Sequence, residues 1–210
     1  MKIESPDFSH GGVLTAEFAF GRPGDQGEPC VLSTNRNPGL RWADLPAATR
    51  SLVLLCVDPD VPSRADDVNQ AGRTVPAELP RVEFAHWLLI DIPAELREIG
   101  TGSCSEGVTP RGKTAPAGPA GSRQGINDYT GWFAGDADMA GDYYGYDGPC
   151  PPWNDSIPHR YFFRLLALDI ERLPLDDGFR LADVYRAVQG HVLGETATFA
   201  RYSLNPKVPA

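Results

Sequence analysis

The chain lacks any long apolar stretch, and this absence argues against a membrane-spanning protein. In its 210 residues no segment approaches the roughly 20 consecutive apolar residues of a transmembrane helix. The N-terminal segment Met1–Asp7 is polar and has no apolar core of the kind that secretory signals carry. We therefore expect a cytoplasmic protein without a membrane span.

Basic residues are also in short supply. The chain has 19 Lys and Arg against 28 Asp and Glu, which gives a formal net charge of −9. Such a surface repels nucleic-acid phosphates and anionic lipid headgroups, so we expect no nucleic-acid partner. An anion that binds this protein must be held by a local site, against the field of the whole molecule.

Cysteine is sparse as well, and no pair has the C-x-x-C spacing of metal or redox motifs. Cys56 lies in the apolar run Ser51–Val57, where a small core residue is the simplest interpretation. Cys104 and Cys150 lie in loop-like sequence and could meet in space. In a reducing compartment we favour two free thiols.

The common signatures of catalysis are missing. There is no G-x-S-x-G elbow, P-loop, dinucleotide fingerprint or H-E-x-x-H helix, and no serine stands beside either histidine of the candidate site. We therefore assign no catalytic residue, no metal ligand and no cofactor.

The residues that are present favour an all-β fold. Runs rich in β-branched and aromatic residues, bounded by Gly, Pro, Asn and Asp, predict strands over Gly12–Phe20, Gly39–Trp42, Ser51–Val57, Val82–Ile92 and His159–Ile170. No helical pattern separates the central strands, so an antiparallel sandwich or barrel is favoured over parallel winding. We expect one domain over residues 1–210.

Helical spacing occurs only near the C-terminus. Apolar residues recur at helical intervals in two groups, which Gly190 separates: Leu181, Val184, Tyr185 and Val188, then Val192, Leu193, Thr196 and Ala197. The sequence therefore predicts two C-terminal helices that close the β core.

A long insert rich in Gly, Pro and aromatic residues occupies about residues 100–147. Its first part, Thr109–Arg123, is expected to be mobile. Its second part, up to Tyr146, carries so many aromatics that we predict an ordered flap, packed on the sheet or on a second subunit. A homodimer is therefore possible.

Two segments, each leading to a histidine, are the strongest functional signal. Asp58–Pro62 precedes the strand that carries His86, and Gly148–Pro152 precedes the strand that begins with His159 and Tyr161. Strand alternation places His86 on one face with Val82, Phe84, Leu88 and Ile90. Asp58, Asp60, the two histidines and Tyr161 could converge on an apolar floor, while Gly148 could present backbone N–H groups to an anion.

Each of these features also has a purely structural interpretation. Asp58 and Asp60 could accept backbone N–H groups in a rigid turn, because the neighbouring prolines restrict the chain. His86 could be a satisfied core residue, and Tyr161 could pack on Phe163. The Gly148 segment could be a stiff wall, because prolines donate no hydrogen bond.

Taken together, these motifs resemble the phosphatidylethanolamine-binding protein family, also called the Raf kinase inhibitor-like family, in its bacterial and archaeal branch. The resemblance covers most of the chain and rests on these segments: Asn37–Trp42, Asp58–Pro62, Phe84–Pro93, Gly148–Phe163 and Gly190–Glu195. It implies a Greek-key antiparallel β-sandwich with a pocket for a small anion or a phospholipid headgroup.

The resemblance also implies which residues form that pocket. The ligand residues would be Asp58, His86, His159 and Tyr161. The rim would be shaped by Asp60, Pro62, Gly148 and Pro149. By a looser similarity, Tyr202 would cover the pocket. The kinase-inhibitor role of the eukaryotic branch transfers poorly, because a fold does not carry its partners with it.

Three classes of function follow from these observations. The leading hypothesis is a non-enzymatic binding module for a small anion or phosphorylated headgroup. The first alternative is a hydrolase or metal-dependent enzyme that uses the histidines and carboxylates. The second alternative is an interaction module that regulates a kinase-like partner.

Overall fold

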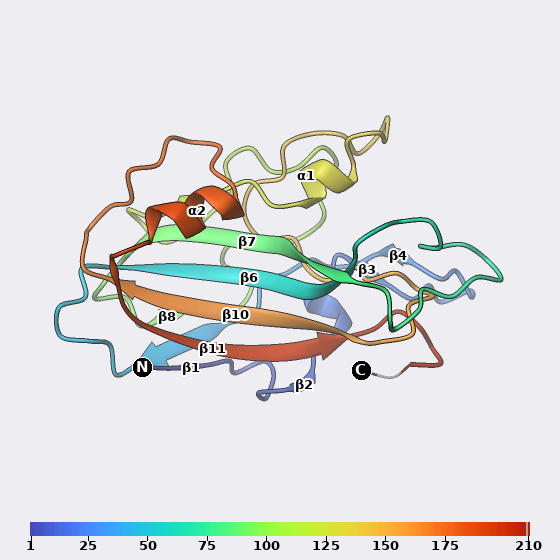
Figure 1. Cartoon of the computed structure of the whole chain (residues 1–210), viewed down its shortest axis with the longest axis horizontal. Coiled ribbons are helices and arrows are strands. Elements are labelled where there is room, and N and C mark those ends of the chain that lie inside the picture. The colour runs from blue at the N-terminus through green and yellow to red at the C-terminus, as the bar shows by residue number, and fades with distance from the viewer. Residues whose placement is uncertain (209) are drawn as a thin grey trace.

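The computed structural model describes residues 1–208 and residue 210, and its regular structure is mostly β-sheet (Figure 1). The strands are β1 (Lys2–Glu4), β2 (Gly12–Val13), β3 (Gly21–Arg22), β4 (Val31–Leu32), β5 (Leu40–Ala43), β6 (Ser51–Pro62), β7 (Arg81–Pro93), β8 (Glu98–Ile99), β9 (Arg123–Gln124), β10 (His159–Leu168) and β11 (Val192–Tyr202). The helices are a 3-10 turn at Ala16–Phe18, α1 (Tyr129–Trp132) and α2 (Leu181–Ala187).

Two sheets enclose the main core. The larger sheet has the order β2-β11-β10-β6-β7-β9, and its four long strands pair antiparallel (Figure 1). The smaller sheet has the order β1-β5-β8. Apolar side chains of both sheets, such as Trp42 of β5 and Phe163 of β10, belong to one buried cluster. The two sheets therefore share one buried core, while the Greek-key sandwich stays a prediction.

Helix α2 covers the outer face of the larger sheet. Val184 of α2 and Phe179 before it belong to a second buried cluster with Leu55, Leu88 and Leu166 of the sheet. Helix α2 covers one face of the larger sheet and the smaller sheet covers the other, so the central strands of the larger sheet are apolar on both faces.

The three long predicted strands are confirmed, with one extension that matters for the site. Strand β6 continues beyond Val57 to Pro62, and Asp58 pairs with Phe84 of β7 before the register shifts. The Asp58 carboxylate accepts the backbone N–H of Asp60 at 2.8 Å, as a turn would require. The Asp-Pro-Asp motif is therefore an irregular strand end, which fixes the direction of both carboxylates.

The prediction of a continuous strand over Gly12–Phe20 is wrong. Only Gly12–Val13 is a strand, and a 3-10 turn follows at Ala16–Phe18. The backbone N–H of Phe18 donates to the carbonyl of Thr15 at 3.1 Å. The chain thus turns inward to bury Phe18 and Phe20 instead of continuing along the sheet.

The prediction of a second C-terminal helix is also wrong, because Val192–Tyr202 is strand β11. Val192 and Leu193, which suggested a helical stripe, are 42% and 39% exposed. The buried residues of this segment alternate instead: Thr198, Ala200 and Tyr202. Pairing with β10 over its whole length satisfies the backbone of β11 and outweighs the weak helical spacing.

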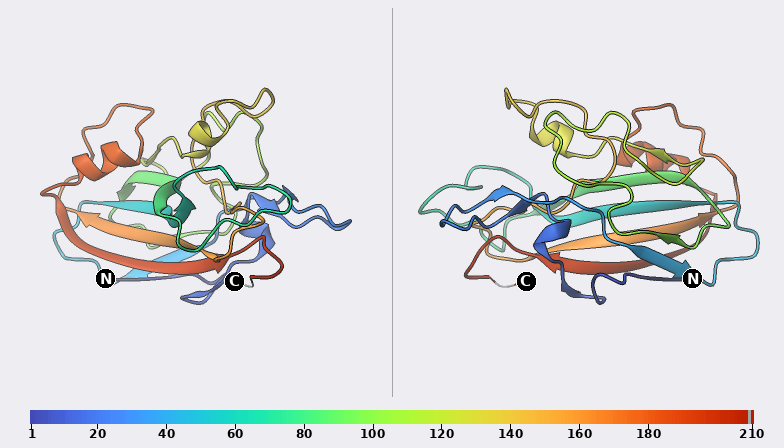
Figure 2. Two further views of the ribbon diagram at one scale, coloured as in Figure 1. Left: turned by 45° about the vertical axis from the view of Figure 1, so that its right-hand side comes forward. Right: turned by 180° about the vertical axis from the view of Figure 1, so that it is seen from behind.

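The insert forms part of the main structure. Its strand β9 pairs with β7, and its loops lie with α1 along the β7 side of the sheet (Figure 2). Tyr129, Tyr143 and Tyr146 are buried, so the predicted packing of the aromatic segment is confirmed, while Trp132 is 49% exposed. The mobility of Thr109–Arg123 and the homodimer stay predictions.

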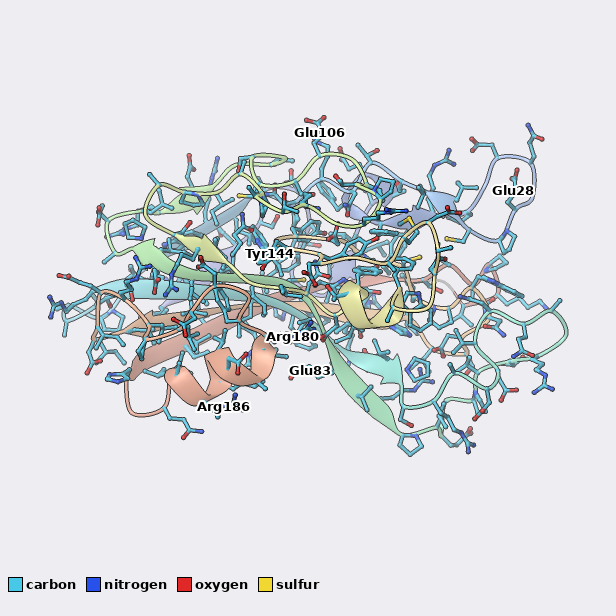
Figure 3. All side chains as sticks on the ribbon, turned by 90° about the horizontal axis from the view of Figure 1, so that it is seen from above. Glu28, Glu83, Glu106, Tyr144, Arg180 and Arg186 are labelled. Carbon is cyan, nitrogen blue, oxygen red and sulfur yellow. The ribbon has the colours of Figure 1, made fainter. Side chains whose placement is uncertain are left out.

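Strands β3 and β4 form a separate hairpin beside the larger sheet. The hairpin projects from one end of the molecule, and Figure 3 shows Glu28 near its tip. Its base lies against the Gly148–Pro152 segment, since the N–H groups of Phe20 and Gly21 donate to the Pro149 carbonyl.

Candidate functional site

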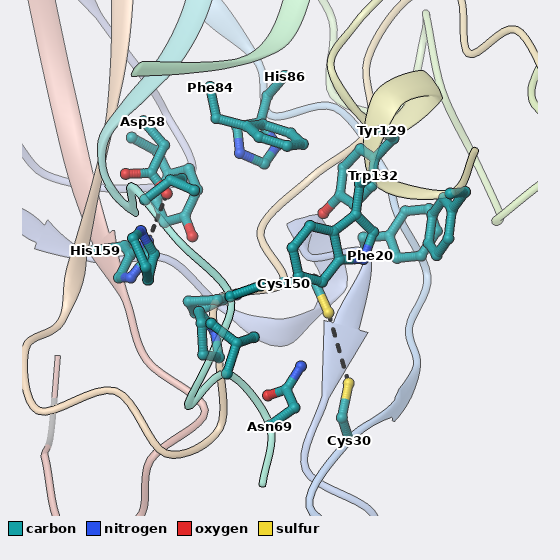
Figure 4. Close-up of a pocket in the computed structure, with 18 of the residues that line it drawn as sticks. Phe20, Cys30, Asp58, Asn69, Phe84, His86, Tyr129, Trp132, Cys150 and His159 are labelled. Carbon is teal, nitrogen blue, oxygen red and sulfur yellow. Dashed lines mark hydrogen bonds and ion pairs between the residues drawn. The ribbon is translucent and has the colours of Figure 1, made fainter. Parts of the chain in front are cut away.

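A cavity of about 240 Å³ opens where β6, β7 and β10 meet α1 and the Gly148–Pro152 segment (Figure 4). Its polar lining includes Asp58, Asn69, His86, His159 and Tyr161. Most of the remaining wall is apolar or aromatic and includes Phe20, Leu32, Val61, Pro62, Val68, Phe84, Tyr129, Trp132, Phe133, Cys150, Pro151 and Pro152. An apolar cavity with a few convergent polar groups is typical of small-molecule sites.

An irregularity in β7 directs His86 into this cavity. In the pairing with β6, Cys56 lies opposite Trp87 and Val57 lies opposite Ala85, so His86 is the extra residue of a β-bulge. The bulge interrupts the alternation, and the ring of His86 contacts that of Tyr161 at 5.2 Å between centroids. Phe84 shares the cavity face with His86 as predicted, but Leu88 and Ile90 face the α2 side, so the prediction is wrong for these two residues.

His86 is a neutral hydrogen-bond acceptor toward the cavity. Its Nδ1 lies 2.7 Å from the carbonyl oxygen of Asp147, which can only accept, so Nδ1 carries the proton. Burial lowers the pKa of His86, and the imidazole is therefore uncharged at neutral pH. Nε2 is the nitrogen left for a ligand.

Asp147, whose carbonyl accepts the hydrogen bond from His86, is itself held by a separate set of buried hydrogen bonds. The Asp147 carboxylate accepts from Lys113 Nζ at 2.8 Å, Asn35 Nδ2 at 2.8 Å and Asn127 Nδ2 at 2.9 Å. Because Asp147 is 1% exposed and fully partnered, its carbonyl oxygen is a fixed anchor for the imidazole ring.

His159 differs from His86 because two carboxylates hold it. Its Nδ1 lies 2.6 Å from Asp58, and its Nε2 lies 3.1 Å from Asp155. Burial opposes the charged imidazole, yet the two carboxylates outweigh burial and raise the pKa of His159 to about 9. Both ring nitrogens are occupied, so His159 supplies charge and orients Asp58 without a free donor for a ligand.

Arg81 completes this cluster. Its guanidinium donates to the two oxygens of Asp155 at 2.6 and 3.0 Å. Burial opposes the charge on Asp155, but hydrogen bonds from His159 and Arg81 lower the pKa of its carboxyl. The negative charges of Asp58 and Asp155 are balanced by the positive charges of His159 and Arg81. The polar end of the cavity therefore carries no net charge.

Tyr161 presents a free donor. Its hydroxyl is buried and has no hydrogen-bond partner within the described residues. Burial raises the pKa of Tyr161 well above its ordinary value, so the hydroxyl keeps its proton. Leaving a buried hydroxyl without a partner costs free energy, which a ligand oxygen would recover.

The structure brings together Asp58, Pro62, His86, His159 and Tyr161 of the predicted site, but not the other members. Asp60 is directed away from the cavity, toward the guanidinium of Arg160 at 2.7 and 2.9 Å. Burial opposes the charge on Asp60, but these hydrogen bonds lower the pKa of its carboxyl.

Gly148 and Pro149 lie behind the cavity wall. The N–H of Gly148 donates to the Asn35 side chain at 2.8 Å, so it is not available to an anion. Tyr202 does not line the cavity, and its hydroxyl donates to the Gly21 carbonyl at 2.9 Å. These residues support the wall that Cys150, Pro151 and Pro152 form.

Sequence reasoning missed Asp155, Arg81 and Asp147. Asp155 precedes His159 by four residues, and a carboxylate that close to a histidine was a usable signal. The other two are visible only in three dimensions, because Asp147 acts through its backbone and Arg81 acts through Asp155.

Over residues 1–208 and 210, no group of three or more His, Cys, Asp or Glu side chains is placed to hold a metal ion. In the same part of the chain no helix has the length and apolar character required to cross a membrane.

Comparison with known proteins is consistent across the chain. The sequence profile described as "Phosphatidylethanolamine-binding protein" matches residues 4–203. A UPF0098 protein of Methanothermobacter thermautotrophicus is 37% identical over 168 residues, which cover 80% of this chain and 83% of the relative. The UPF0098 protein YbhB of Escherichia coli is 30% identical, with 97% of this chain and 100% of YbhB covered.

A solved structure agrees with these sequence matches. The crystal structure of Escherichia coli YbcL, described as a new member of the mammalian PEBP family, superposes with a TM-score of 0.67 at 25% identity. The superposition covers 96% of this chain and 97% of YbcL. A Chlamydia trachomatis homologue, at 22% identity and a TM-score of 0.63, shares the fold.

Proposed function

This chain belongs to the phosphatidylethanolamine-binding protein family, and from that premise we propose that it is a non-enzymatic binding protein for a small molecule with a phosphorylated headgroup. The headgroup would occupy the polar end of the cavity, between His86 and Tyr161. The apolar part of the molecule would lie along the aromatic wall toward Trp132.

The unpartnered hydroxyl of Tyr161 is the observation that carries this proposal. A phosphate oxygen is a strong acceptor for such a donor. The neutral Nε2 of His86 is a complementary acceptor, suited to the O–H of a singly protonated phosphate. A phosphomonoester headgroup in its singly protonated form therefore satisfies both groups, whereas its dianion satisfies only Tyr161.

The electrostatics predict weak binding. The cavity lining contains no Lys or Arg, so the bidentate guanidinium contact of tight phosphate sites is missing. The Asp58–His159–Asp155–Arg81 cluster is neutral and neither attracts nor strongly repels an anion. We expect dissociation constants between millimolar and high micromolar for the headgroup alone.

The apolar wall supports an amphiphilic ligand over inorganic phosphate. Leu32 and Trp132 are 56% and 49% exposed, although both line the cavity. A ligand that covers them gains free energy from burial of apolar surface, at roughly 25 cal/mol per Å².

An enzymatic role is the second hypothesis, and the site favours it less. The neutral imidazole of His86 could act as a general base, but no serine or threonine lines the cavity, and its two cysteines, Cys30 and Cys150, contact each other at 3.6 Å between their Sγ atoms. Regulation of a kinase-like partner and a cytoplasmic location stay predictions.

Calorimetric titration with phosphoethanolamine tests the proposal. Tyr161→Phe removes only the donor and keeps the ring packed, so affinity should fall by about 1.5–3 kcal/mol, or roughly 10- to 100-fold. Tyr185→Phe is the matched control, because Tyr185 is bonded to Glu83 and Arg164 away from the cavity. Equal binding by wild type and Tyr161→Phe would refute the assignment of the donor.

A further inference from the structure

Two thiols meet at the mouth of the cavity, and the function proposed above makes no use of them. Cys30 immediately precedes β4 and Cys150 lies in the Gly148–Pro152 segment, yet their Sγ atoms are 3.6 Å apart (Figure 4). The loop-like sequence around Cys104 and Cys150 had suggested these two as a possible pair. Cys104 is buried elsewhere, beside Ser103 and Asn37.

The backbone makes room for this pair of sulfurs. A Cβ atom on Gly21 would lie 2.7 Å from Cys30 Sγ and 2.5 Å from Cys150 Sγ, which no real Cβ contact allows. Glycine at position 21 is thus required for both thiols to occupy this place. Both cysteines line the cavity and are partly exposed, so a small oxidant reaches them from solvent.

We propose that Cys30 and Cys150 are a redox-active dithiol, which a small-molecule disulfide oxidises to an intramolecular disulfide that alters the mouth of the ligand cavity. The bond would tie the β3–β4 hairpin to the Gly148–Pro152 segment. The sulfurs would move from 3.6 Å to bonding distance, about 2.05 Å, and so shift the wall that Cys150 contributes.

The chemistry has a defined order. A hydrogen bond from the Cys150 thiol lowers the pKa of Cys30, whereas the same bond and burial raise the pKa of Cys150. The Cys30 thiolate attacks one sulfur of the oxidant, forms a mixed disulfide and releases one small thiolate. Cys150 then loses its proton, attacks the Cys30 sulfur and releases the second thiolate. The protein loses two electrons and two protons, and the oxidant gains them as two thiols.

The test uses oxidised glutathione and intact-mass spectrometry of the folded protein. Wild type should lose the mass of two hydrogen atoms, and peptide mapping should join Cys30 to Cys150. Cys150→Ser cannot complete the second step, so it should instead retain one glutathione on Cys30. Cys104→Ser is the matched control and should react as wild type does.

Two further readouts connect the chemistry with the geometry. Gly21→Ala, which forces the sulfurs apart, should slow disulfide formation at least tenfold while the protein stays folded by circular dichroism. The affinity for phosphoethanolamine should differ between the oxidised and reduced wild type, and the original affinity should return after reduction with dithiothreitol.

A disulfide that includes Cys104, or wild type that keeps all thiols reduced in excess oxidised glutathione, would overturn the redox assignment. Equal affinity of both redox forms would overturn its link to the cavity.

Discussion

The two histidines of the site have the same side chain and opposite protonation states, and their immediate partners explain the difference. Burial lowers the pKa of His86, and its hydrogen bond to the Asp147 carbonyl, which favours the charged form, does not offset burial. His159 is equally buried, but two carboxylates raise its pKa to about 9. His86 is thus a neutral acceptor that faces the cavity, and His159 is a charged member of an ionic cluster with no net charge.

This difference predicts how anion binding depends on pH. Sulfate has a fixed charge, so only protein groups titrate when it binds. His159 stays protonated from acidic pH to well above neutrality and contributes no slope there, whereas His86 gains a proton below its lowered pKa and becomes a donor. Sulfate affinity should therefore be flat from about pH 6.5 to 8 and increase only at more acidic pH.

Calorimetry of wild type and His86→Gln at several pH values measures this dependence. The acidic increase should be absent from the variant. An affinity that falls steadily between about pH 6.5 and 8 in both proteins would assign the charge to a different group.

The raised pKa of His159 also predicts how stability depends on pH. Below the unfolded pKa of about 6.5, both folded and unfolded states hold the proton, and the full stabilisation is present. As pH rises from there through about 9, the unfolded chain loses its proton first, and roughly 3 kcal/mol of stability is lost.

Urea unfolding at pH 6.5 and 9.5 checks this sign and size. Asp58→Asn removes one of the charges that raise the pKa, so the decrease should be smaller in this variant than in wild type. An equal decrease in both proteins would contradict the role of Asp58.

At the scale of elements, the Gly148–Pro152 segment positions the cavity wall through backbone contacts. A Cβ on Gly148 would lie 2.0 Å from the carbonyl oxygen of Phe18, which belongs to the rigid 3-10 turn. Gly148→Ala should therefore displace the segment and destabilise the protein by about 1–3 kcal/mol.

Denaturant unfolding with a matched glycine variant tests this prediction. Gly135→Ala is the control, because nothing lies within 4 Å of its added Cβ, and it should be neutral or slightly stabilising. If both variants unfold at the wild-type midpoint, the close approach to Phe18 has no structural importance.

Sequence patterns predicted the long strands because each is apolar and β-rich over its whole length, as in Ser51–Val57. They failed at Val192–Tyr202, where strand pairing with β10 outweighed a short helical spacing. They also failed to place His86, since a bulge shifts the alternation by one residue and leaves no mark in the sequence. Local periodicity describes an element, but not the register in which its neighbour holds it.

The candidate site follows the same rule. Asp58, His86, His159 and Tyr161 were predictable as a set, because they lie in motifs shared with a known family. The residues that hold them could not be predicted, since Arg81 and Asp155 are 74 residues apart in the sequence and meet only in the folded chain. The tautomer of His86, with the proton on Nδ1, depends on the Asp147 carbonyl, which only the folded chain brings to it.

On the scale of the whole molecule, the net charge of −9 contrasts with a polar cavity end that is neutral. The larger sheet makes this contrast possible, because β6 supplies Asp58 and β10 supplies His159, and this carboxylate–imidazole pair is buried within the protein (Figure 4). A net negative charge disfavours long-range attraction of anions, so the proposed binding of a headgroup would depend on Tyr161 and His86.

The most direct test of the central claim is nuclear magnetic resonance of the protein labelled with nitrogen-15 at histidine, titrated with phosphoethanolamine at neutral pH. The chain has four histidines, and each serves as a control for the others. The His86 Nε2 resonance, assigned with His86→Gln, should shift and saturate in parallel with the calorimetric curve, while those of His10 and His191 stay in place. A His86 signal that does not move when calorimetry shows the protein saturated would contradict the binding site described here.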